Sequence, residues 1–194
     1  MRKSSVPPES ELDVRTERLL LRPMRESDIA ATVAALGDIE VSRRLARVPH
    51  PYTEHDARAF LEIVARGRAE GAIDHFMIVR RDSASDNDGA PIGAIGVHGD
   101  SGAPGVSGAS TAEVGYWIAR PHWGKGYARE ALAAIVHRAF FVRTPPITLL
   151  TSHVHETNIA SRRVLVACGF VEIGRRIASC AATGVDVPAI EFEL

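Results

Sequence analysis

Hydrophobic and polar positions alternate through the middle of the chain and then change to a helical period. The stretch 113–118 alternates, with Val114, Tyr116 and Ile118 at its apolar positions, which predicts a strand ended by Pro121. A glycine turn follows. The helix expected after it has one buried face, formed by Ala128, Ala131, Leu132, Ile135, Val136, Ala139 and Phe140. This order of strand, turn and helix brings backbone N–H groups and the positive end of a helix dipole together, which is typical of a phosphate-binding site.

Other segments predict short strands and helices in a mixed order. Ser27 and Thr53 are typical N-cap residues, Asp56 can complete a capping box with Thr53, and Gly169 is typical of a helix end. Residues 38–52 indicate a partly helical connection over the substrate side. Strands are expected at 16–23, 75–80, 92–98, 113–118, 147–154, 170–180 and 187–194, the last two joined by a turn at 183–184. The order β-α-α-β-β-β-α-β-α-β-β predicts a mixed α/β sheet, with 147–154 in its middle.

Composition narrows the class of protein. A chain of 194 residues favours one domain, expected at 14–194, after a flexible leader at 1–13 that is rich in Pro and Ser. The net charge of −1 argues against nucleic-acid binding, and no apolar run is long enough for a membrane span. Two cysteines fit a reduced, cytoplasmic protein, and no Cys/His cluster has the spacing of a zinc site. For the Gly/Ser-rich residues 99–110, we favour a surface insertion over a substrate lid.

The glycine turn lacks two common phosphate-binding fingerprints. Gly124-Lys125-Gly126 is followed by Ala128 and Arg129 rather than by the third glycine of the dinucleotide-binding motif. Lys125 precedes Gly126, so the Gly-Lys-Ser/Thr sequence of a Walker motif is absent as well. The run Trp123-Gly124-Lys125-Gly126-Tyr127-Ala128 instead resembles the pyrophosphate loop of the GNAT N-acetyltransferases, with Trp123 in place of their Gln or Arg. That Trp, followed later by Asn158-x-x-Ser161, resembles the RimJ/RimL-type branch, as does the opening Thr-Glu-Arg-Leu-x-Leu-Arg.

The resemblance covers about residues 14–194 and implies the GNAT fold, with about seven strands in a mixed sheet flanked by four helices. It also implies acetyl-CoA as the acetyl donor, an amine-bearing acceptor and a possible homodimer. The free strand edge at Trp117 and Ile118 is where the pantetheine arm would add, and Asn158 resembles a residue that hydrogen-bonds that arm. The residues expected around the pyrophosphate are Trp123, Gly124, Lys125, Gly126, Tyr127, Ala128 and Arg129.

Acetyl transfer to an amine requires a proton acceptor, because the amine is mostly protonated at neutral pH. Glu113, at the start of the strand before the turn, is the first candidate, since the resembled family often assigns this role to a strand glutamate. His98 and His153 are rivals, because imidazole exchanges protons near neutral pH. The alternative for Glu113 is a solvated cross-strand pair.

The departing thiolate requires a proton donor. Many members of the family have a tyrosine where this chain has Leu165, so the resemblance implies Ser161 near the sulfur instead. Ser161 could equally bond its own helix backbone, and Asn158 could simply cap that helix. Nothing near Cys180 in the sequence would activate it as a nucleophile. We therefore expect an acetyl-CoA-dependent N-acetyltransferase that works by direct attack in a ternary complex. A non-catalytic CoA-binding module is the alternative, and a nucleotide or NAD binder is disfavoured.

Overall fold

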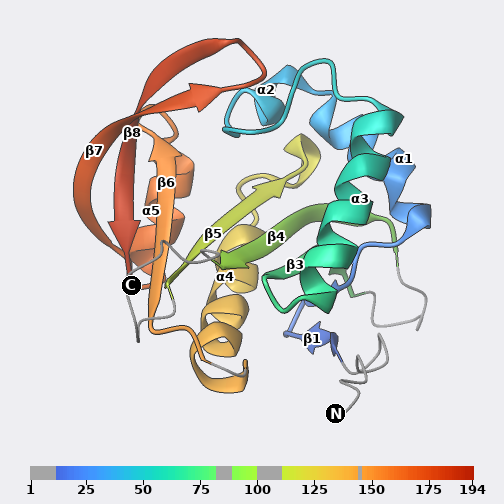
Figure 1. Ribbon diagram of the computed structural model, residues 1–194, viewed down its shortest axis with the longest axis horizontal. Coiled ribbons are helices and arrows are strands. Elements are labelled where there is room, and N and C mark those ends of the chain that lie inside the picture. The colour runs from blue at the N-terminus through green and yellow to red at the C-terminus, as the bar shows by residue number, and fades with distance from the viewer. Residues whose placement is uncertain (1–11, 82–88, 100–110, 144–145) are drawn as a thin grey trace.

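A mixed eight-stranded sheet forms the centre of the protein (Figure 1), and a computed structural model describes residues 12–81, 89–99, 111–143 and 146–194. The strands follow the spatial order β1-β2-β3-β4-β5-β6-β8-β7, and every neighbouring pair is antiparallel except β5 and β6. They span Val14–Arg15 (β1), Leu19–Arg22 (β2), Ile73–Arg80 (β3), Pro91–Gly99 (β4), Thr111–Ile118 (β5), Leu149–His155 (β6), Val171–Cys180 (β7) and Val185–Glu193 (β8).

Helices cover both faces of the sheet. They span Ile29–Leu36 (α1), Ile39–Ser42 (α2), Glu54–Ala69 (α3), Tyr127–His137 (α4), which continues as a π-helical stretch over Arg138–Val142, and Ile159–Ala167 (α5). Figure 1 shows α3 in front of the sheet and α4 behind it. One core cluster lies between the sheet and the helices α4 and α5, and a second lies under α1 and α3. No helix of the described ranges is long and apolar enough to cross a membrane.

The predicted mixed α/β fold is confirmed, with two local differences. The sheet has eight strands rather than about seven, because the two-residue strand β1 is too short to show an alternating pattern. Ser27 does not cap a helix, since it lies inside the 3-10 turn Glu26–Asp28 that precedes α1. The connection 38–52 is partly helical, as predicted, because it contains the short helix α2. Residues 1–11 of the leader predicted at 1–13, and residues 100–110 of the loop predicted at 99–110, lie outside the described residues.

Several local predictions are confirmed. Thr53 caps α3 and exchanges hydrogen bonds with Asp56 in a capping box. Gly169 follows α5 with a φ of +94°, the left-handed conformation that favours glycine at a helix end. Strand β6 lies inside the sheet, between β5 and β8, as its two apolar faces predicted.

A buried ion pair joins β2 to the start of α1. The Arg22 guanidinium donates to both carboxylate oxygens of Asp28, at 2.7 and 2.8 Å, and both side chains are almost fully buried. Asp28 also accepts a hydrogen bond from the backbone N–H of Arg25. The pair therefore fixes the entry of α1 onto the sheet.

Replacing Asp28 by Ala should lower the free energy of unfolding by about 3–5 kcal/mol, because the buried Arg22 charge loses its partner. Urea unfolding followed by circular dichroism measures the change. Glu26→Ala is the matched control, because Glu26 pairs with Arg58 at an exposed site and its loss should cost less than about 1 kcal/mol. Equal losses in the two variants would contradict this role for the buried pair.

Candidate acetyl-transfer site

Strands β5 and β6 separate after a short parallel contact. They pair only from Thr111 with Leu149 to Glu113 with Thr151, and β6 then pairs with β8. In Figure 1 the two strands lie side by side where they begin and diverge towards their ends. Along 114–118, β5 pairs with β4 alone among the described strands. One backbone edge of β5 therefore faces the gap.

The end of this edge is fixed by the turn that follows it. The indole Nε1 of Trp123 donates to the carbonyl oxygen of Ile118 at 2.6 Å. The guanidinium of Arg44 stacks over the Trp123 ring, 5.1 Å from its centroid. Trp123 thus links β5, the turn and the segment after α2. A Gln or Arg at this position has no aromatic ring on which Arg44 could stack.

The glycine turn opens directly onto the N-terminus of α4. Gly124 and Gly126 have φ values of +72° and +80°, and Gly126 is the N-cap, with no side chain bonded to the helix end. A Cβ added at Gly124 would meet no atom within 4 Å. The Lys125 ammonium donates to the carbonyl oxygen of Pro121 at 3.0 Å. The first-turn N–H groups of α4, which have no partners within the helix, are therefore left to bind an anion.

An arginine from the start of the sheet holds this turn in place. Arg18 donates to the carbonyl oxygen of Lys125 at 3.0 Å and lies over the ring of Tyr127, 4.9 Å from its centroid. Its Nε pairs with Glu130 at 2.7 Å, and Glu130 also accepts from Thr16 at 2.6 Å. Burial raises the pKa of Glu130, but these hydrogen bonds outweigh it and the pKa is lowered. The acid in the first turn of α4 is thus held by basic and hydroxyl partners.

The three predicted base candidates lie together across neighbouring strands. Glu113 pairs in register with His98 of β4, and its Oε1 lies 3.2 Å from Nδ1 of His153 on β6. Arg47, from the segment after α2, donates to Oε2 of Glu113 at 3.3 Å. The hydrogen bond from His153 and the charges of His153, Arg47 and His98 outweigh burial and hold the pKa of Glu113 below its usual range. Burial and the Arg47 charge lower the pKa of His98.

A pair of hydroxyls lies on the opposite side of β5. The phenol oxygen of Tyr116 is 2.8 Å from Oγ of Ser161 and 3.2 Å from the carbonyl oxygen of the same residue. Burial raises the pKa of Tyr116, so its phenol stays protonated at neutral pH. Asn158 caps α5, because its side-chain oxygen accepts from the Ser161 N–H at 3.3 Å. Leu165 is fully buried in the core. A side chain at this position therefore does not face a solvent-accessible site, where a tyrosine would act.

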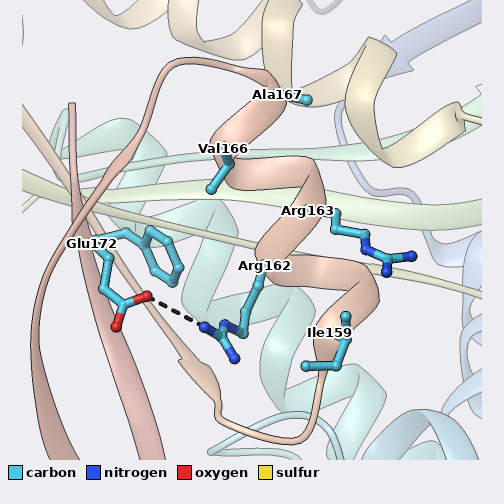
Figure 2. A pocket seen from close by; sticks show the side chains of 7 residues that line it. Ile159, Arg162, Arg163, Val166, Ala167 and Glu172 are labelled. Carbon is cyan, nitrogen blue, oxygen red and sulfur yellow. Dashed lines mark hydrogen bonds and ion pairs between the residues drawn. The ribbon is translucent and has the colours of Figure 1, made fainter.

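The helix that carries Ser161 is fastened to the C-terminal hairpin. Arg162 of α5 pairs with Glu172 of β7 at 3.3 Å and crosses a hollow beside the helix (Figure 2). None of the residues predicted to bind acetyl-CoA or to act in catalysis lines this hollow, which is formed by Ile159, Arg162, Arg163, Val166, Ala167, Glu172 and Phe192. Cys180 is buried and its thiol donates to the carbonyl oxygen of Arg43 at 3.4 Å, so it contributes to packing rather than to this site.

Comparison with known proteins identifies this arrangement. A family model described as "Acetyltransferase (GNAT) domain" matches residues 18–171. The chain belongs to the GNAT acetyltransferase family. It is therefore an N-acetyltransferase that uses acetyl-CoA, of the RimJ/RimL type that the turn and the Asn-x-x-Ser sequence resembled.

Its relatives are distant in sequence. The uncharacterized N-acetyltransferase p20 of Bacillus licheniformis is 27% identical over 160 residues, which cover 82% of each chain. The structure of Mycobacterium smegmatis RimJ in complex with CoA-disulfide matches with a TM-score of 0.70 at 20% identity, over 91% of this chain and 81% of that one. The ribosomal-protein-S5-alanine acetyltransferase from Vibrio fischeri matches with a TM-score of 0.75 at 17% identity, over 94% and 95%. These structural likenesses support the shared fold.

The GNAT site in this chain has the features that acetyl-CoA requires. The open, glycine-lined helix end can accept a pyrophosphate. The edge of β5 around Tyr116, which has no neighbouring strand among the described residues, can accept a pantetheine amide, whereas the carbonyl oxygens of Val114 and Ile118 already accept from Ser152 and Trp123. Arg129 is exposed in the first turn of α4, whereas Ala128 packs against the core. Two residues of the site did not come from sequence reasoning. Tyr116 and Arg47 lie 45 and 66 positions from their partners, and nothing local in the sequence signals either contact.

Replacing Gly124 by Ala should weaken acetyl-CoA binding at least about tenfold, because a methyl group would occupy the approach to the helix end and a left-handed φ strains any residue with a Cβ. Isothermal titration calorimetry measures the dissociation constant. Gly184→Ala is the matched control: Gly184 has a φ of +68° and equally open surroundings, but it lies in the β7–β8 turn. Similar losses of affinity in both variants would show that backbone strain alone explains the effect.

Proposed function

We propose that this GNAT enzyme transfers the acetyl group to a primary amine by direct attack in a ternary complex. The observation that carries the proposal is that β5 places a carboxylate on one face and a hydroxyl pair on the other, next to its open edge. Glu113 lies on the side of α1 and α3, and the Tyr116–Ser161 pair lies on the side of α5. A thioester bound along the edge would then have a proton acceptor on the amine side and a proton donor on the sulfur side.

Glu113 is proposed as the residue that receives the proton of the acceptor ammonium. Its lowered pKa keeps it ionised at neutral pH, so it attracts the ammonium and frees the nitrogen lone pair. A carboxylate of lowered pKa holds a proton weakly. His153, with Nδ1 3.2 Å from Oε1, donates a hydrogen bond that holds the carboxylate in place, and the proton then leaves Glu113 for solvent. The nitrogen then forms the bond to the thioester carbon as the carbon–sulfur bond breaks, and the second proton that the nitrogen loses neutralises the departing thiolate, which leaves as the CoA thiol.

Ser161 is proposed to donate a hydrogen bond to the departing sulfur. The single phenolic proton of Tyr116 can be given to the carbonyl oxygen of Ser161 or to its Oγ. When Tyr116 donates to Oγ, the hydroxyl proton of Ser161 is available for the sulfur, and the bond strengthens as charge develops there. Tyr116 thereby supplies from β5 the tyrosine that the sequence lacks at Leu165.

The acceptor is proposed to be an amine on a protein N-terminus or on a small molecule. The ribosomal-protein-S5-alanine acetyltransferase of Vibrio fischeri, which shares this fold, favours the first. The homodimer suggested by the resemblance stays a prediction, which light scattering coupled to gel filtration would measure.

Glu113→Gln should lower kcat about 10²–10³-fold while leaving acetyl-CoA affinity unchanged, because the amide cannot accept the ammonium proton. Because the pKa of Glu113 is lowered, the wild-type carboxylate stays ionised at every pH above the range in which carboxyl groups ordinarily titrate. The deficit of the variant should therefore stay constant from about pH 6 to about pH 9 and shrink only as Glu113 itself becomes protonated. Initial rates of CoA release measure it. A deficit that grows between pH 6 and 8 would assign the titrating base to a histidine instead.

Ser161→Ala and Tyr116→Phe should each lower kcat about tenfold or more, and the double variant should lose less than the product of the two effects, because both hydroxyls act on one proton transfer. The measurement is a double-mutant cycle on kcat at saturating acetyl-CoA. Tyr52→Phe is the control, since it removes a buried phenol from the cluster under α1 and α3. Independent, multiplicative effects of the two hydroxyls would contradict the proposed donor pair.

A further inference from the structure

On the face of the sheet that carries Glu113, one glycine of β5 is exposed beside residues that are packed under helices. In register across β3, β4 and β5, the residues Met77, Ala94 and Trp117 form one row on this face, and they pack under α1 and α3. The next row contains His75, Gly96 and Gly115, and the row after it contains Ile73, His98 and Glu113. Gly115 is exposed, and a Cβ added to it would meet no atom within 4 Å.

The opening is confined to β5. Its neighbour Gly96 is buried, and a Cβ there would lie 3.0 Å from both His75 and His98. His75 in turn packs edge-on against Phe60 of α3, with ring centroids 5.0 Å apart. The backbone of Gly115 is therefore accessible from outside between two functional positions, Glu113 and Trp117, while the adjacent strand is closed. We call this opening the Gly115 port.

Arg47 contacts the proposed proton acceptor, Glu113, which lies one row from the Gly115 port. The backbone next to Arg47 is fastened to the C-terminal hairpin, because the N–H of Ala181 donates to the carbonyl oxygen of Ala46 at 2.9 Å. Its guanidinium pairs with Glu113 at 3.3 Å, yet 76% of the side chain is exposed. A firmly held backbone with an exposed side chain allows the guanidinium to turn from Glu113 to a ligand without movement of the chain.

The charges around Glu113 favour one kind of acceptor. The groups that act on this carboxylate are His153, Arg47 and His98, all of them basic. An acceptor that carries only positive charge would pair with Glu113 in place of Arg47. The Arg47 guanidinium would then lie unpaired beside a second cation, which is unfavourable. An acceptor that carries an anionic group near its amine would instead exchange partners, with its ammonium on Glu113 and its anion on Arg47.

We propose that the acceptor enters at the Gly115 port and carries a carboxylate or phosphate close to its primary amine, which Arg47 binds. This inference rests on the proposed role of Glu113. An extended peptide advances about 3.3–3.6 Å per residue, so in a protein N-terminus the acidic side chain belongs at the second or third position. A small amino acid or an aminoalkyl phosphate offers the same chemistry in one molecule.

The first test compares acceptors of equal length. Peptides beginning Ala-Asp, Ala-Asn and Ala-Lys, otherwise identical, are assayed for kcat/KM beside free aspartate, aminoethyl phosphate and spermidine. Asp should exceed Asn about threefold and Lys about tenfold, because an exposed charge pair contributes a factor of a few and the lysine reverses its sign. Arg47→Gln should remove the preference and Arg47→Glu should reverse it. Arg43→Gln, a matched change in the same segment, should preserve it.

The second test closes the Gly115 port. Gly115→Leu should abolish turnover of every acceptor and leave the dissociation constant of acetyl-CoA unchanged, since the added side chain enters open space on the acceptor face. Full turnover in this variant would contradict the proposal that the acceptor enters at the Gly115 port. Equal use of the Asp and Lys peptides by the wild type, or no turnover of the Asp peptide, free aspartate and aminoethyl phosphate alike, would overturn the role of Arg47. If Glu113→Gln remains fully active with every probe, the proposed catalytic function fails as well, which separates the two conclusions.

Discussion

Strands β5 and β6 stay together for three residue pairs and then part, while the other edge of β6 stays paired with β8. A strand edge without a neighbour inside a sheet presents N–H and C=O groups that another extended chain can satisfy. In this chain the edge lies between the glycine turn before α4 and the first turn of α5. The pyrophosphate turn, the hydroxyl pair and the carboxylate are all arranged around the point where the two strands separate.

The alternation of side chains lets one strand serve both sides of this point. Glu113 and Gly115 face the acceptor side, whereas Tyr116 faces α5. A shift of one residue in the pairing of β4 and β5 would exchange the two sides and destroy the site. The register is fixed partly by close contact: a Cβ at Gly93 would lie 2.3 Å from the carbonyl oxygen of Trp117.

Local patterns were sufficient to predict the strand, turn and helix around Gly124, the capping box at Thr53 and the helix end at Gly169, because each depends on residues close in sequence. They could not predict β1, which is too short for a pattern. Contacts such as Arg47 with Glu113 and Tyr116 with Ser161 depend on how distant segments pack, so the sequence could suggest Glu113 and Ser161 as candidates but not the partners that tune them.

The contacts of Arg18 have a further consequence. They tie the turn between β1 and β2 to the carbonyl oxygen of Lys125 and to Glu130, so the outermost strands of the sheet and the cofactor turn are ordered together. By thermodynamic reciprocity, a ligand that stabilises one of two coupled segments stabilises the other by the same free energy. At the proposed site, acetyl-CoA bound at this turn would therefore stabilise the distant β1–β2 edge of the sheet, and local unfolding of that edge would weaken acetyl-CoA binding.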